Sequence, residues 1–198
     1  MLRRPAGPRR VVTVAVTAAL ALAVALPAWA HRPVILTKDD TPGNGPRVTA
    51  GEVSFAFYGW LNRPSDTRSF TLTLAAGRRF HLEAFVPDLV PERAIPRQEL
   101  PRITVLSPDG RETRVPADLY ERFHEEHAGT RLIRYARLDR TAEAGTYRVV
   151  VTGTRAQRFV VATGQSEREG GLENGAVATV RDVVHWYRTP APYDPAGL

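Results

Sequence analysis

The sequence predicts an all-β fold, an antiparallel, jelly-roll-like β-sandwich followed by a C-terminal α-helix. Three observations predict it. Apolar and polar residues alternate with a period of two along several short segments, turn-forming glycines and prolines separate these segments, and one stretch near the C-terminus has helical spacing instead. About seven to nine short strands with one terminal helix are typical of two antiparallel sheets packed face to face.

The strongest strand signal lies in residues 69–86, which contain two alternating runs joined by a turn at Ala76 and Gly77. Because two such runs around a glycine-containing turn are typical of a β-hairpin, we expect the two strands to pair with each other. His81 lies on the polar face of the second run, where we expect it to point to solvent. The residues expected to face the core are Phe70, Leu72 and Leu74, then Phe80, Leu82, Ala84 and Val86.

Weaker signals mark the other elements. Residues 118–129 predict a loop or one helical turn. Near the C-terminus, Asn174 is a candidate N-cap for a helix that begins near Gly175. That helix is amphipathic, with Val177, Val180, Val184 and Tyr187 on one face. The remaining strands are expected at residues 34–36, 52–61, 102–106, 131–138, 147–151 and 157–163.

The first 30 residues have the parts of a secretory signal: an arginine-rich start, an uncharged and mostly apolar run, and an Ala-Trp-Ala cleavage site that ends at Ala30. The run is shorter than the roughly 20 apolar residues that a membrane-spanning helix needs. We expect export and cleavage after Ala30, and thus a secreted or extracytoplasmic protein; an uncleaved leader that anchors the chain in the membrane is the alternative. The chain then divides into a signal peptide (1–30), an N-terminal arm (31–50), a β-sandwich domain (51–164) and a C-terminal helix and tail (165–198).

The composition excludes several classes of function. The chain has 27 basic and 21 acidic residues, and four of the basic ones lie in the leader, so 23 basic and 21 acidic residues remain after cleavage. No basic block is left to bind nucleic acid. The sequence contains no cysteine, which excludes disulfides, thiolate metal sites and cysteine catalysis. No serine or carboxylate pair lies in a recognisable catalytic pattern, so we do not expect an enzyme.

Residues 53–164 resemble the pre-peptidase C-terminal (PPC) type of secreted β-sandwich. The matching pieces are Asp66 with Phe70, the Ala76-Gly77 turn, the Pro108-Asp109-Gly110 turn, and the strand start Ala144-Gly145-Thr146-Tyr147. The resemblance implies an accessory or binding module of the kind attached to secreted enzymes, and this sequence departs from that pattern because it contains no enzyme domain. The part after the leader also resembles a group of uncharacterised exported proteins, through His31-Arg32-Pro33, Phe57-Tyr58-Gly59 and Val86-Pro87-Asp88. That second resemblance implies export and fold, and leaves the function open.

His31 becomes the first residue of the protein if cleavage follows Ala30. The free α-amino group and the imidazole of one histidine can then bind a single copper ion, because Cu(II) favours nitrogen ligands in a tetragonal arrangement. The site needs a further ligand, and the candidates are His81, His124, His127 and His185. The alternative is that His31 is an ordinary exposed terminal residue.

Two other groups of side chains are candidate metal ligands. His124 and His127 flank two glutamates at a spacing of three, which would put both rings on one face of a helical turn and would suit zinc. A solvated charged loop is the alternative. Asp39, Asp40 and Asn44 offer oxygen atoms to calcium, without the ligand spacing of a known calcium loop.

An aromatic pair, Tyr58 and Trp60, shares one face of the strand at residues 52–61. This pair is either a flat platform for a sugar or a protein partner, or a set of side chains that pack beneath the C-terminal helix. Taken together, the sequence predicts an exported, non-catalytic binding or accessory module at the cell envelope or outside the cell. Its partner would be a protein or a carbohydrate, with no cofactor. The alternatives are a copper-binding protein that uses His31 and an enzyme that acts on a polymer.

Overall fold

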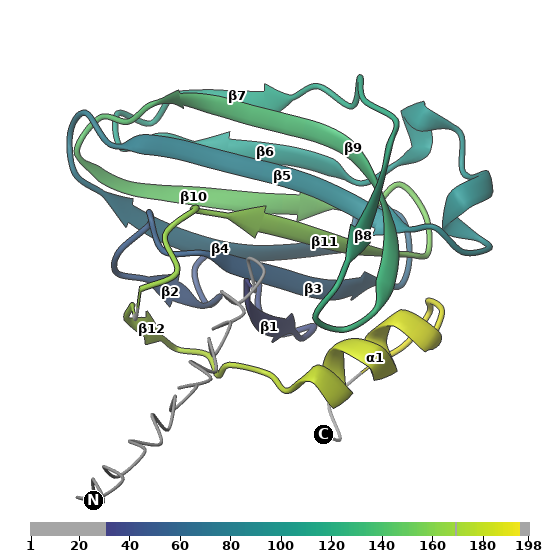
Figure 1. Ribbon diagram of the computed structural model, residues 1–198. Coiled ribbons are helices and arrows are strands. Elements are labelled where there is room, and N and C mark those ends of the chain that lie inside the picture. The colour runs from purple at the N-terminus through teal and green to yellow at the C-terminus, as the bar shows by residue number, and fades with distance from the viewer. Residues whose placement is uncertain (1–30, 169, 195–198) are drawn as a thin grey trace, which may run out of the picture.

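The computed structural model describes residues 31–168 and 170–194, which fold into two six-stranded sheets packed face to face (Figure 1). The predicted leader, residues 1–30, and its cleavage after Ala30 lie outside the described residues. The first sheet has the order β1 (Arg32–Leu36), β3 (Phe55–Leu61), β11 (Gln157–Thr163), β5 (Arg79–Pro87), β9 (Thr130–Thr141) and β8 (Glu121–Glu125). The second sheet has the order β12 (Leu172–Glu173), β2 (Arg47–Val48), β4 (Thr67–Leu74), β10 (Gly145–Thr152), β6 (Arg102–Leu106) and β7 (Glu112–Val115).

Eight of these strands have the order of a jelly roll, which confirms the predicted fold class. The strands β3, β11, β5 and β9 form one antiparallel set and β4, β10, β6 and β7 form the other. Four short strands extend these sets at their edges. Two of them, β1 and β2, pair in parallel with β3 and β4, so the sheets are mixed rather than wholly antiparallel.

The predicted hairpin is wrong. The runs that contain Phe70 and Phe80 are the strands β4 and β5, but they lie in opposite sheets, and the turn at Gly77 carries the chain from one sheet to the other. Their apolar rows face each other across the core. Alternation shows that a strand has one buried face, and it does not show which strand is its neighbour. His81 is also not exposed, since only 8% of it is accessible on the outer face of β5.

Two other local predictions differ from the structure. Residues 121–125 form the edge strand β8, which pairs with β9, instead of a loop or helical turn. The helix α1 spans Val180–Arg188 and begins later than expected, with Thr179 as its N-cap. Asn174 has a positive φ and its side-chain amide donates to the carbonyl of Gly45, so it fixes a turn instead of capping the helix.

The buried apolar side chains form two clusters, one between the sheets and one on the outer face of the first sheet. The outer cluster lies beneath α1, which packs against β1 and β3 at one side of this sheet (Figure 1). Trp186 of α1 is fully buried, and its indole donates to the carbonyl of Gly59 at 3.0 Å. The strand β3 is therefore buried on both faces, by the second sheet and by α1.

Long loops gather at one end of the sandwich, on the right in Figure 1. One of them, residues 88–101, contains the 3-10 helices η1 (Glu92–Ala94) and η2 (Arg97–Glu99). This loop is fixed to β11 by a buried ion pair, because the carboxylate of Glu92 accepts from Nε and Nη2 of Arg158 at 2.8 and 2.6 Å. Among the residues that the structure describes, no helix is long and apolar enough to cross a membrane.

Candidate functional site

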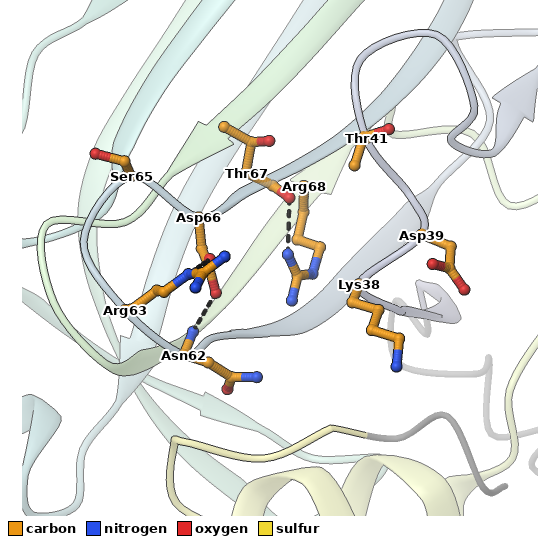
Figure 2. A pocket seen from close by; sticks show the side chains of 9 residues that line it. All are labelled: Lys38, Asp39, Thr41, Asn62, Arg63, Ser65, Asp66, Thr67 and Arg68. Carbon is orange, nitrogen blue, oxygen red and sulfur yellow. Dashed lines mark hydrogen bonds and ion pairs between the residues drawn. The ribbon is translucent and has the colours of Figure 1, made fainter.

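A polar hollow of about 600 Å³ opens at the loop end of the sandwich (Figure 2). Two connections form it: residues 37–41, which follow β1, and residues 62–66, which join β3 to β4. Because strands hold both ends of each connection, the side chains between them are presented from a rigid base, as binding residues on sandwich folds commonly are. The lining residues are Lys38, Asp39, Thr41, Asn62, Arg63, Ser65, Asp66, Thr67 and Arg68.

Arg68 reaches the hollow from the inside of the sandwich. It belongs to the same face of β4 as Phe70, Leu72 and Leu74, so a guanidinium continues a row that is otherwise apolar. Only 4% of Arg68 is accessible. Figure 2 shows its side chain pointing into the hollow, between Asp66 and Lys38.

The hydrogen bonds of Arg68 use only part of its guanidinium. Nη1 donates to the carbonyl of Thr67 at 2.8 Å. Nε is buried and has no acceptor. Within the described residues no carboxylate forms an ion pair with Arg68, although most buried arginines have one. Burial lowers the pKa of Arg68, and nearby carboxylates such as Asp66 and Asp40 act in the opposite direction. Arginine still keeps its charge at neutral pH.

Two of the carboxylates near Arg68, those of Asp66 and Asp40, are bound to other groups. Asp66 accepts from the backbone N–H of Asn62 at 2.8 Å and from Nε of Arg63 at 3.0 Å. Asp40 accepts from the backbone N–H and the hydroxyl of Thr37, at 2.6 and 3.0 Å. Burial raises the pKa of Asp40, against these two hydrogen bonds. These carboxylates therefore fix the shape of the two connections, and neither forms an ion pair with Arg68.

At the rim, Lys38 donates from Nζ to Asp194 at 2.7 Å. The hydroxyls of Thr41, Ser65 and Thr67 and the side chain of Asn62 also line the hollow. One buried cation surrounded by hydroxyl and amide groups can hold an anionic group whose neighbouring atoms are polar. This arrangement is suited to binding.

His31 is half-buried and held by a hydrogen bond. Its Nδ1 forms a short hydrogen bond with the hydroxyl of Ser54, and burial lowers the pKa of its ring. Among the described residues no three His, Asp or Glu side chains are placed to hold a metal ion together. The α-amino group that copper would need exists only after cleavage beyond the described residues, so copper binding by His31 stays a prediction.

His124 and His127 do not share a helical face, because His124 lies in β8 and His127 lies in the turn after it. Both are exposed, and the neighbouring Glu125 accepts from the backbone N–H of His127 at 2.9 Å. The helical turn on which the zinc hypothesis depended is absent at residues 118–129. The calcium candidates support a turn instead, since the side chain of Asn44 donates to the carbonyl of Asp39.

Tyr58 and Trp60 do not form an exposed platform. They are 4% and 1% accessible, because α1 and the residues after it cover them. The rings of Tyr58 and Trp186 form a T-shaped pair at a centroid distance of 4.9 Å, and Nε1 of Trp60 donates to the carbonyl of Thr189 at 2.9 Å. The packing alternative is what the structure shows. Burial raises the pKa of the Tyr58 hydroxyl.

Sequence reasoning missed Arg68, although a signal was present. The alternating run that places Phe70, Leu72 and Leu74 inward extends back by two residues to position 68. A charged residue in an inward row is unusual, because an unpaired buried charge costs several kcal/mol. Such a residue indicates either a buried ion pair or a site for a ligand.

The fold and the hollow define a jelly-roll sandwich with a polar recess at its loop end. No protein-family model and no curated protein matches the sequence. One of the solved structures that it resembles is PliG of Salmonella Typhimurium, a periplasmic inhibitor of g-type lysozyme. The identity is 12% and the TM-score is 0.34, over 68% of this chain and 98% of that chain.

Proposed function

We propose that the protein is an exported, non-catalytic binding protein that presents the loop end of its sandwich to a ligand at the cell envelope or outside the cell. Export rests on the predicted leader. Binding rests on a single observation, the buried guanidinium of Arg68 at the base of the hollow, whose Nε has no acceptor and which has no ion pair within the described residues.

The observation supports binding because an apolar side chain at position 68 would cost the fold less free energy than a buried arginine. An apolar side chain would continue the row of Phe70, Leu72 and Leu74 without burying a charge. Natural proteins keep destabilising groups mainly where function needs them. A ligand that supplies an acceptor to Arg68 would remove the penalty, and this gain in free energy would contribute to affinity.

Hydrogen exchange tests the proposal on the protein that lacks residues 1–30. The probe is an enzymatic digest of cell-envelope polymers from the producing organism, containing soluble sugars and peptides. We expect slower exchange in residues 37–41 and 62–68 when the digest is present, and no change across β8 or α1. The variant Arg68→Met should abolish the slowing.

Two results would count against the proposal. Slower exchange confined to another surface would show that the protein binds there and that the hollow is not its site. No change anywhere, with the wild-type protein folded and the digest in excess, would overturn the proposal of an envelope-binding protein.

A further inference from the structure

We propose that the hollow recognises a carboxylate group that carries a single negative charge, on a ligand that is polar next to that group. This inference rests on the proposed function and identifies the chemical class of the ligand.

The two edges of the Arg68 guanidinium differ in their hydrogen bonds: one edge has an acceptor within the protein and the other has none. Nη1 is used internally, by the carbonyl of Thr67. Nε has no acceptor, and no described residue accepts from Nη2. Nε–H and one N–H of Nη2 are parallel, and together they match the two oxygens of a carboxylate. The open edge is therefore the edge that binds a planar anion through two hydrogen bonds.

The charges around the hollow indicate one negative charge on the ligand. Among the three cations that line it, Lys38 is paired with Asp194 and Arg63 with Asp66, so within the described residues only Arg68 has no ion pair. Asp39 and Asp66 also line the hollow and would repel a dianion. A carboxylate can pair with Arg68 and meets less repulsion from these two acids than phosphate, which carries more than one negative charge at neutral pH.

The rest of the lining indicates what surrounds the carboxylate on the ligand. Hydroxyls of Thr41, Ser65 and Thr67 and the amide of Asn62 donate and accept hydrogen bonds, and the lining contains no aromatic ring. Hydroxyl or amide groups next to the carboxylate fit these side chains. A sugar acid and the C-terminal end of a peptide both present a carboxylate in such a setting.

The experiment follows the Nε–Hε resonance of Arg68 by nuclear magnetic resonance during titration of the protein that lacks residues 1–30. One arm uses glucuronate, with glucose as its uncharged counterpart. A second arm uses N-acetylglycine, with N-acetylglycinamide as its counterpart. A third arm uses inorganic phosphate. We expect a saturable shift with at least one carboxylate, none with either neutral compound, and weaker binding of phosphate.

Variants separate recognition from folding. Arg68→Met should lose the carboxylate response and melt at the same temperature as the wild type or higher, because it removes a buried charge that has no ion pair. Arg68→Lys keeps the charge but loses the planar pair of donors, and it should weaken binding roughly tenfold. Arg148→Met is the matched control: Arg148 lies on β10, outside the hollow, and is half-buried, and its Nε also has no partner. Its loss should leave the carboxylate response unchanged.

The outcomes are distinct. A response in the glucuronate arm alone identifies a sugar acid as the source of the carboxylate, and a response in the N-acetylglycine arm alone identifies a peptide end. Phosphate binding as tight as carboxylate binding, or an equal response in Arg68→Met, overturns the inference. If no carboxylate shifts Arg68 while the envelope digest still slows exchange at residues 62–68, the ligand class is wrong and the proposed function stands.

Discussion

Arg68 and Arg158 are both almost fully buried, and their surroundings differ. Arg158 holds the carboxylate of Glu92 through two nitrogens and also donates to the carbonyl of Tyr187, so its charge and its N–H groups have partners. Arg68 donates to the backbone carbonyl of Thr67 and forms no ion pair with a carboxylate of the described residues. The first arginine connects a loop and the end of a helix to a strand, and the second leaves donors available at the base of a hollow.

The Glu92–Arg158 pair should be needed for stability. In Glu92→Gln the buried guanidinium of Arg158 loses its counter-charge, so we expect the free energy of unfolding to fall by about 3–5 kcal/mol. Urea denaturation at pH 7 measures it. The control is Glu99→Gln, which removes an ion pair to Arg155 that is about half exposed, 48% and 47% for the two side chains, and should cost less than about 1 kcal/mol. Equal losses in the two variants would show that the buried pair is not special.

Asp139 should make stability depend on pH. Burial acts to raise the pKa of Asp139, but hydrogen bonds from Arg79 and His81 outweigh it, and the pKa lies below its usual value of 3.8. A carboxyl whose pKa is lower in the folded state stabilises the fold above its unfolded pKa, and that contribution is lost as the pH falls through the folded pKa. Asp139→Asn should therefore lower the melting temperature at pH 7, with a difference that shrinks below about pH 4. Melting curves between pH 3 and 8 test this, and a constant difference would contradict it.

At the scale of elements, the sequence was informative about strands and uninformative about their neighbours. The alternation in residues 69–86 located β4 and β5, because burial of one face leaves a period of two. It could not show that they lie in opposite sheets, since both rows face the same core from either side. The strand β8 was missed for another reason. At the edge of the first sheet it buries little, so ERFHE carries charged residues typical of a protected edge instead of an apolar row.

The candidate site depended on information that the sequence does not display directly. The histidines and aromatic residues were candidates because of their residue types. The structure decides their roles, since α1 covers Tyr58 and His124 lies in an edge strand instead of a helical turn. Arg68 could have been noted from its place in an inward row. That Arg68 has no ion pair could not be predicted from the sequence, because it depends on which groups the carboxylates of Asp66 and Asp40 bind.

The N-terminus of α1 gives a prediction for a single element. The hydroxyl of Thr179 accepts from the backbone N–H of Asp182, and the carboxylate of Asp182 accepts from the backbone N–H of Thr179 at 2.7 Å, which is a capping box. The carboxylate also accepts from the hydroxyl of Thr179, and the two hydrogen bonds that it accepts lower the pKa of Asp182. Thr179→Ala should lower the free energy of unfolding by about 1 kcal/mol, and Thr179→Ser should cost little because it keeps the hydroxyl. Chemical denaturation measures both, and an equal loss in the two variants would show that the capping hydroxyl is not what stabilises the helix.

At the scale of the whole molecule, the two sheets are held together without disulfides, since the sequence contains no cysteine. Residues 31–50 contribute to both sheets: β1 pairs with β3, and β2 pairs with β4. Val34, Leu36 and Val48 from this segment lie in the core between the sheets. The segment that precedes the predicted sandwich domain therefore closes one side of the sandwich. It also leads directly into the hollow through residues 37–41.

Removing this segment should thus affect the whole fold. A protein that begins at His31 should unfold in one cooperative transition, because every described strand is retained. A protein that begins at Gly51 exposes the edges of β3 and β4 together with part of the core, and it should aggregate or lose the cooperative transition. Leu36→Ala tests the same contacts within the longer protein: its side chain is fully buried, so we expect a loss of about 2–5 kcal/mol. Thermal melting with light scattering compares the three proteins. A protein starting at Gly51 that melts like the longer one would show that the sandwich is complete without β1 and β2. It would also show that residues 37–41 and 62–66, the two connections around Arg68, do not belong to one folding unit.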